Sequence, residues 1–275
     1  MTAGRVHTAV IPVAGLATRI QPIARSVPKE MLPLGDKPML HHVVEELVNG
    51  GIQHIIFVLG TRSEAIERYF HYLPDLDGDW SAREANPVWS KILRCSFTFV
   101  RQERPSGVID AVRRAYWNVG SGPYIVHMGD SIIHKDTGLI ERMIACHDHN
   151  SADLTIGVSW RIPHPTSASG AVESTERIGQ DHSQPFSVTR FRAIAESDPL
   201  NNPYVIGRYL LEGPMPAVTV PPGRQARFGS LTSLIPSGDS ASVMAVPLIG
   251  DEQLLGAGTT VEYAASWRRL LEVGV

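Results

Sequence analysis

The sequence predicts an α/β fold in which a Rossmann-like, mostly parallel mixed sheet is flanked by helices and extended by a smaller β-rich part. Strand and helix patterns alternate over the first 60 residues, which is the order of right-handed β-α-β units. The first apolar runs are continuous, as in strands that are covered on both faces. After residue 161 proline, serine, glycine and charged residues dominate, which predicts short strands there.

The expected strands are apolar runs of four to eight residues. A continuous run predicts a strand buried on both faces, and an alternating run predicts a half-buried strand. In chain order the expected strands are Thr8–Val13, Ile55–Leu59, Cys95–Phe99, Tyr124–Met128, Leu154–Val158, Tyr204–Leu211 and Val243–Pro247.

The expected helices carry apolar residues at three- and four-residue spacing. In chain order they are Pro38–Asn49, Glu64–Phe70, Val108–Ala115, Asp136–His147 and Val261–Leu271. Gly50-Gly51 ends the first helix, and Ser63 is expected to cap the second. The polar residues 71–92 predict an excursion outside the core, and residues 212–240 show no clear pattern.

Length and composition fit one domain with an elaborated edge as well as two domains. We expect a single domain over residues 1–275, with a first half at 1–150 and a second half at 151–275. Hydrophobic residues make up 43% and charged residues 19% of the 275 residues. The net charge of −3 predicts no nucleic-acid partner, and no apolar run approaches the roughly 18–20 residues that span a bilayer. The N-terminus lacks a secretory apolar region, and two cysteines form no disulfide framework, so we expect a cytoplasmic protein.

The most informative stretch is Val10–Pro38. Its strand runs into a turn of small residues, Ala14-Gly15-Leu16-Ala17, and Arg19 and Lys29 follow. Small residues let backbone N–H groups approach phosphate oxygens, and fixed cations neutralise the remaining charge. The stretch has neither the glycine pattern of a P-loop nor that of a dinucleotide fold. It therefore predicts a polyphosphate site of another kind.

This stretch resembles the sugar-1-phosphate nucleotidyltransferases, most closely the bacterial UTP–glucose-1-phosphate uridylyltransferases. Their pattern runs G-x-G-T-R, then P-K-E-M-L-P, then D-K-P. The chain matches this pattern at Gly15, Thr18, Arg19, Pro28 to Pro33 and Asp36 to Pro38. It departs at Ala17, where the family has glycine, and at Ala24-Arg25, where Thr-Lys is usual.

The resemblance implies roles for individual residues. Arg19 matches the arginine over the leaving pyrophosphate, Lys29 matches the catalytic lysine, and Asp130 lies in the segment that binds Mg²⁺. Asp130 also ends an apolar strand, where open α/β sheets place ligand-binding groups, and a carboxylate there suits Mg²⁺ held with substrate phosphates. The implied nucleotide-binding residues are Ala14, Gly15, Gln102 and Gly107, and the implied sugar-binding residues are Gly170 and Glu196.

Each of these residues also has a purely structural interpretation. Arg19 could pair with a carboxylate, Lys29 could be a surface charge, and Asp130 could be a turn residue. Glu30 could orient Lys29 or be solvated. Gln102 can offer a donor and an acceptor to a pyrimidine, but it could equally belong to a polar loop before a helix.

The second half departs from the family. The family's Glu-Lys-Pro motif corresponds to Phe191–Pro199, where no Glu-Lys pair is present and where Glu196 or Arg192 could substitute only in part. Gly256 stands where the family has a second metal-binding aspartate, and Asp251 or Glu252 is a candidate replacement. The resemblance therefore covers the triphosphate half of the site better than the sugar half.

Three functions are compatible with this pattern. We expect transfer of a nucleotidyl group from a nucleoside triphosphate, by resemblance UTP with dTTP or CTP as alternatives, to a sugar 1-phosphate. Pyrophosphate is released and a nucleotide-sugar is formed. The first alternative is an inactive relative that binds nucleotide or nucleotide-sugar in a regulatory or scaffolding role. The second is another α/β enzyme or binding module for a phosphorylated ligand. A homo-oligomer is a further implication of the resemblance.

Overall fold

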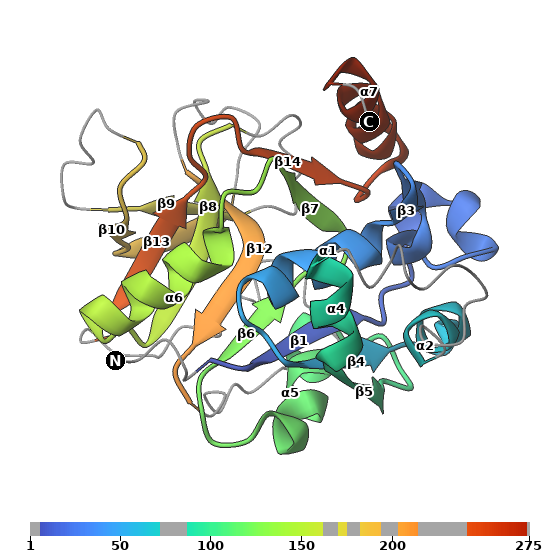
Figure 1. Cartoon of the computed structure of the whole chain (residues 1–275), viewed down its shortest axis with the longest axis horizontal. Coiled ribbons are helices and arrows are strands. Elements are labelled where there is room, and N and C mark those ends of the chain that lie inside the picture. Colours follow the sequence, from blue (N-terminus) through green and yellow to red (C-terminus); the bar gives the residue numbers. More distant parts are fainter. Residues whose placement is uncertain are drawn as a thin grey trace.

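A ten-stranded mixed sheet forms the centre of the computed structural model, which describes residues 6–71, 87–161, 170–174, 182–193, 203–213 and 241–273 (Figure 1). Its strands lie in the order β10-β13-β8-β12-β6-β1-β4-β5, and β9 joins β12 to β11. The strands are β1 Thr8–Val13, β4 His54–Leu59, β5 Ser96–Arg101, β6 Tyr124–His127, β8 Leu154–Ser159, β9 Gly170–Glu173, β10 Phe186–Ser187, β11 Arg190–Ala193, β12 Tyr204–Leu211 and β13 Val243–Pro247. The expected α/β fold with a mostly parallel sheet is confirmed.

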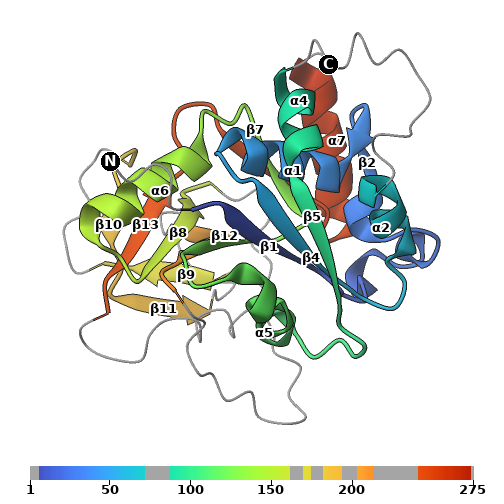
Figure 2. The ribbon, with the colours of Figure 1, turned by 60° about the horizontal axis from the view of Figure 1, so that its bottom comes forward.

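Helices cover both faces of this sheet. One apolar core joins α1 (Met39–Asn49), α2 (Glu64–His71), α4 (Pro87–Arg94) and α6 (Leu139–Asn150) to one face, and a second core joins α5 (Val108–Val119) to the other. Figure 2 shows α5 alone below the sheet, opposite α1, α4 and α6. None of the described helices is long and apolar enough to cross a bilayer.

Strand direction places the loops of several strands at one edge of the sheet. Strands β5, β4, β1 and β6 are parallel, and β12 runs antiparallel to both β6 and β8. The carboxyl ends of β1, β4, β6 and β8 therefore lie at the same edge, where open α/β sheets bind ligands. Strands from the second half of the chain, β8, β12 and β13, belong to the same sheet as the first-half strands.

Three smaller units lie beside the main sheet. A hairpin of β2 (Pro33–Leu34) and β3 (Lys37–Pro38) follows the short 3₁₀ turns Thr18–Ile20, Ile23–Arg25 and Lys29–Met31. A second pair joins β7 (Ser131–His134) to β14 (Gln253–Gly256). The closing helix α7 (Thr260–Val273) packs on β14 (Figure 1).

The expected strands and helices agree with the structure within a few residues, with three corrections. Residues 87–92, expected to lie outside the core, belong to α4, whose Ile92 is buried. The Ser63 hydroxyl does not cap α2. It accepts a hydrogen bond from the Gly60 N–H and donates one to the Val13 carbonyl, so it joins the loops after β1 and β4. The pair β7–β14 was not expected.

Candidate functional site

Two adjoining cavities of about 250 and 270 Å³ lie at the carboxyl edge of the sheet. Both are lined by the turn Ala14-Gly15-Leu16-Ala17, by Lys29 and by Gln102. The first is also lined by Gly107 and Asp130. The residues that the sequence predicted for the nucleotide side therefore meet at one place, although they come from four separate segments.

Lys29 and Asp130 form a direct ion pair at the floor of this site, and each side chain is 14% exposed. Burial alone would lower the pKa of Lys29, but the carboxylates of Asp130 and Glu30 outweigh it and raise that pKa above its ordinary value. Burial likewise opposes ionisation of Asp130, yet the Lys29 ammonium and the Arg19 guanidinium hold the pKa of Asp130 below its ordinary value. Both groups are therefore charged at neutral pH.

Arg19 lies in the 3₁₀ turn after the small-residue loop, and its side chain is exposed. Its charge acts on both Lys29 and Asp130 and alters the pKa of each. The site thus carries an exposed cation, Arg19, and a largely buried cation, Lys29, which is held by Asp130. A polyphosphate can be held between two such charges.

Glu30 is buried, which excludes the interpretation that it is solvated. Burial raises the pKa of Glu30 to about 7, although the neighbouring Lys29 ammonium, 3.9 Å away, acts in the opposite direction. A Cβ atom at Gly129 would lie 3.3 Å from the Glu30 side chain and 2.7 Å from Val13 Cγ1. Residue 129 must therefore be glycine for Asp130 to sit this close to the sheet.

Ala17 has a left-handed backbone with φ of +50° and ψ of +40°. Residues with a Cβ rarely adopt this conformation, and glycine adopts it freely. Ala17 therefore replaces the family's glycine but keeps the backbone conformation that favours glycine.

Gln102 is buried at the end of β5, and its amide group is held by two acceptors. Gln102 Nε2 donates to the Gly107 carbonyl at 3.1 Å and to Asp110 Oδ2 at 2.7 Å. Both amide hydrogens are used, so the side-chain oxygen is the group that Gln102 offers to a ligand. The sequence predicted that Gln102 offers a base both a donor and an acceptor. In the structure only the acceptor, the side-chain oxygen, is free for a ligand.

The sugar-side predictions are placed only in part. Gly170 begins β9, and its neighbour Ala171 pairs with Tyr204 at the start of β12, which lies at the same sheet edge as Asp130. Glu196 lies outside the described residues. The structure thus brings Gly170 to the edge that carries the nucleotide site.

Neither candidate for the second metal ligand lies in position to act. Glu252 is buried away from Asp130, where it accepts hydrogen bonds from Arg142 at 2.8 Å and from Thr137. Burial opposes its ionisation, but these hydrogen bonds hold the pKa of Glu252 below its ordinary value. Asp251 is exposed in the turn before β14. The structure therefore places neither candidate replacement for Gly256, Asp251 or Glu252, beside Asp130.

Two groups near Asp130 were missed by sequence reasoning. Glu262, on α7, has its pKa raised by burial and by the Asp130 carboxylate. Arg208, on β12, is completely buried and donates to Glu46 and to both oxygens of Ser131. A lone arginine within the apolar run Tyr204–Leu211 was a signal for a buried ion pair. Glu262 had no comparable signal.

The donor set fits a hard divalent cation such as Mg²⁺. Asp130 supplies a carboxylate beside the cavity, and a second carboxylate, Glu262, lies near enough to act on it. Mg²⁺ is typically bound by one or two carboxylates together with substrate phosphates and waters. Among the described residues no group of three or more histidine, cysteine, aspartate or glutamate side chains forms a closed metal site.

Comparison with known proteins gives a consistent result. The chain is 33% identical over 179 residues to the UTP–glucose-1-phosphate uridylyltransferase of Bacillus subtilis (strain 168), which is 64% of this chain and 58% of that protein. It is 31% identical over 213 residues to UTP–glucose-1-phosphate uridylyltransferase 1 of Staphylococcus saprophyticus, which is 76% of this chain and 72% of that protein. The predicted resemblance is confirmed.

The fold is similar to that of a solved UDP-glucose pyrophosphorylase complexed with UDP-glucose. The two structures superpose with a TM-score of 0.76 over 98% of this chain and 100% of the other, at 21% identity. At this identity the similarity describes the fold alone. The sequence model for nucleotidyl transferases matches residues 8–220, which hold nearly all of the site described above. On this match, and on the relatives above, the chain is a member of the nucleotidyl transferase family.

Proposed function

We propose that this protein transfers a nucleotidyl group from UTP to a sugar 1-phosphate, which gives a nucleotide-sugar and pyrophosphate. The observation that carries the proposal is the meeting of Lys29 and Asp130 beside the small-residue turn that follows β1. The relatives from Bacillus and Staphylococcus, named for this reaction with glucose 1-phosphate, support it.

The reaction is an in-line displacement at the α-phosphorus, in which an oxygen of the sugar phosphate attacks and pyrophosphate leaves. Such a step needs positioning and charge neutralisation more than a protein nucleophile. In the proposal Ala14 and Gly15 approach the triphosphate with their backbone, and Arg19 neutralises the leaving pyrophosphate. Lys29 stabilises the charge that develops at the α-phosphate.

Asp130 would hold Mg²⁺ together with the phosphates, and Gln102 and Gly107 would receive the base. Mg²⁺, when bound, supplies charge neutralisation at the phosphate oxygens. The Gln102 oxygen can accept the N3–H of uracil or thymine, whereas cytosine has no hydrogen on N3. This acceptor favours UTP or dTTP over CTP.

The sugar side of the proposal depends on the second half of the chain. We assign residues 1–150 to the nucleotide and residues 151–275 to the sugar phosphate, within one domain. Gly170 would let the sugar approach the backbone at the sheet edge, and Glu196 would contact its hydroxyl groups. Mg²⁺ as the metal, a homo-oligomeric state and a cytoplasmic location belong to the same proposal, by analogy with the family.

Pyrophosphate release tests the proposal. The protein is incubated with Mg²⁺, each nucleoside triphosphate in turn and a panel of sugar 1-phosphates, and release is followed with a coupled assay. We expect release with UTP and at least one sugar 1-phosphate. Absence of release with every pair, with UTP still bound in a calorimetric titration, would exclude transfer and favour the inactive, nucleotide-binding alternative. Sedimentation velocity gives the oligomeric state.

A further inference from the structure

Glu262 lies on the first turn of α7, and one of its oxygens lies over Gly256, next to the Asp130 segment. We propose that Glu262 is the second carboxylate ligand of the divalent cation that Asp130 binds. This inference rests on the proposed function, because it names a further residue for the same site. In it a side chain from a helix takes the place that Gly256 leaves vacant on a strand.

Two glycines form a cradle for the Glu262 carboxylate. The Gly258 N–H donates to Glu262 Oε2 at 3.1 Å, and a Cβ atom at residue 258 would lie 2.7 Å from that oxygen. A Cβ atom at residue 256 would overlap Glu262 Oε1. The space that an aspartate side chain would need at residue 256 is therefore already occupied by a carboxylate oxygen.

The backbone of Gly256 and Ala257, beside the Glu262 carboxylate, also contacts the backbone of Asp130. The Cβ position at residue 256 lies 3.5 Å from the Asp130 carbonyl oxygen, and the Ala257 N–H donates to that carbonyl at 2.9 Å. Strand β14, which ends at Gly256, pairs with Ser131. Glu262 and Asp130 are thus held on either side of one short backbone contact.

Electrostatics support a shared cation between them. Burial and the nearby Asp130 carboxylate raise the pKa of Glu262 above its ordinary value. Among the described residues no lysine, arginine or histidine forms an ion pair with Glu262, whereas Asp130 pairs with Lys29. The Lys29 and Arg19 charges act on both carboxylates but do not outweigh the effect of burial and of Asp130 on Glu262. Two neighbouring carboxylates of which only Asp130 has an ion-pair partner form a donor set that a divalent cation can bind.

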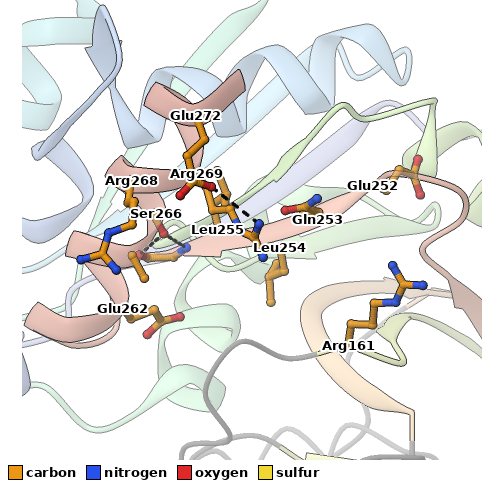
Figure 3. A pocket seen from close by; sticks show the side chains of 12 residues that line it. Arg161, Glu252, Gln253, Leu254, Leu255, Glu262, Ser266, Arg268, Arg269 and Glu272 are labelled. Atoms are coloured by element: carbon orange, nitrogen blue, oxygen red, sulfur yellow. Dashed lines mark hydrogen bonds and ion pairs between the residues drawn. The ribbon is translucent and has the colours of Figure 1, made fainter. Parts of the chain in front are cut away.

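Helix α7 is fixed firmly enough to present Glu262 in one position. Ser266 Oγ donates to the Gly256 carbonyl at 3.0 Å and accepts the Gly256 N–H at 2.9 Å. Tyr263 and Trp267 both donate to the Pro33 carbonyl, within the segment that carries Lys29. Figure 3 shows Glu262 projecting from α7 and Ser266 beside β14, at one side of a cavity of about 560 Å³.

Helix capping is the competing role for Glu262. The Glu262 N–H donates to Thr259 Oγ1 at 3.1 Å, and Thr259 and Glu262 have the spacing of a capping box. The cap uses only Glu262 Oε2, through the Gly258 N–H. Glutamine retains an oxygen acceptor for that cap but has no negative charge, so Glu262→Gln separates the two roles.

The test measures how much Mn²⁺ strengthens nucleotide binding. The dissociation constant of a non-hydrolysable UTP analogue is determined by calorimetry with saturating Mn²⁺ and again in EDTA. The constant in EDTA divided by the constant in Mn²⁺ is the coupling ratio, which reports how strongly the metal favours nucleotide binding. We expect Glu262→Gln to reduce this ratio about 10-fold or more. The dissociation constant in EDTA and the thermal unfolding temperature should both equal those of the wild type. Glu272→Gln, on the same helix, is the matched control and should leave the ratio unchanged.

A second pair of variants tests whether an aspartate at residue 256, on strand β14, can replace the Glu262 carboxylate. Gly256→Asp alone should lower the ratio, because its side chain collides with the Glu262 carboxylate. Combining Gly256→Asp with Glu262→Ala frees that space and should restore the ratio toward the wild-type value.

An unchanged ratio in Glu262→Gln, or a wild-type ratio near one, would overturn the assignment. The proposed reaction and the proposed role of Glu262 can fail separately. If the wild-type protein releases pyrophosphate and Glu262→Gln leaves the ratio unchanged, only the role of Glu262 is rejected. Metal-coupled nucleotide binding without pyrophosphate release rejects the transfer reaction alone.

Discussion

Arg208 donates two hydrogen bonds to Glu46, at 2.9 and 2.8 Å, and both side chains are buried although 162 residues separate them in the chain. The same guanidinium donates to the hydroxyl and the carbonyl of Ser131, at 2.9 and 3.1 Å. Ser131 directly follows Asp130. The pair therefore connects helix α1 and strand β12 to the segment that carries Asp130, the carboxylate proposed to bind the metal.

Removing one partner of this pair should destabilise the fold strongly. Arg208→Met leaves Glu46 buried without its cation, and such an uncompensated charge typically costs about 3–5 kcal/mol. We expect a loss of that size in the free energy of unfolding, measured by urea denaturation. The double variant Arg208→Met/Glu46→Leu removes both charges and should be more stable than Arg208→Met. A loss below about 1 kcal/mol in Arg208→Met would show that the pair contributes little.

The Glu46 carboxylate should also make stability depend on pH. Burial would raise the pKa of Glu46, but Arg208 and His127, the charged and titratable groups that face it, hold its pKa far below the ordinary 4.5. The stabilisation is complete above the unfolded pKa and is lost as pH falls through the interval down to the folded pKa. The stability difference between wild type and Glu46→Gln should shrink by about 1.4 kcal/mol for each pH unit below 4.5. A difference that is the same at pH 7 and pH 3.5 would contradict the assignment.

Lys29 and Asp130 should each be needed for turnover and not for folding. Loss of one charge-stabilising group commonly costs on the order of 10²–10³ in rate, so Lys29→Ala and Asp130→Ala should each reduce pyrophosphate release at least that much. Circular dichroism should show folded variants, because both side chains line a cavity and neither belongs to the apolar cores. Lys91→Ala, at an exposed lysine on α4, serves as the control and should turn over normally. Near-normal release by either site variant would mean that the chemistry lies elsewhere.

Asp110 should determine which base the site accepts. It accepts a hydrogen bond from Gln102 Nε2 at 2.7 Å and thereby directs the Gln102 oxygen to the ligand. In Asp110→Ala the amide can turn over and present its donor to cytosine, so the ratio of kcat/KM for UTP over CTP should fall about tenfold. Arg114→Ala removes the outer partner of Asp110 and leaves the Gln102 contact in place, so that ratio should hold. Equal ratios in wild type and Asp110→Ala would exclude this role.

Much of the fold was predictable because its signals are local. The run Thr8–Val13 is apolar at every position that the sheet buries, and the strand has those bounds. Lys29 and Asp130 could be selected as candidate site residues because each occupies a local pattern, a proline-bracketed loop and a strand end, and the structure brings the two together. Helix α4 was missed because its short amphipathic face, which buries Ile92, follows a polar stretch.

Contacts between distant segments were not predictable, since they depend on the order of the strands. Arg208 meets Glu46 only because β12 inserts between β6 and β8. Glu262 reaches the Asp130 segment only because β14 pairs with β7 and brings α7 with it. The sequence shows the missing aspartate at Gly256, but no local pattern says which side chain fills that space.

The left-handed backbone of Ala17 stores strain in the small-residue turn Ala14-Gly15-Leu16-Ala17. A residue with a Cβ atom loses roughly 1–2 kcal/mol of folding free energy in this conformation. Glycine instead loses about 0.5–1 kcal/mol, because it gives the unfolded chain more conformational entropy. Ala17→Gly should therefore raise the free energy of unfolding by up to about 1 kcal/mol, measured by urea denaturation. Ala265→Gly, inside α7, is the control and should lower it by about 1 kcal/mol. If both variants lost stability equally, the Ala17 backbone would carry no strain that glycine relieves.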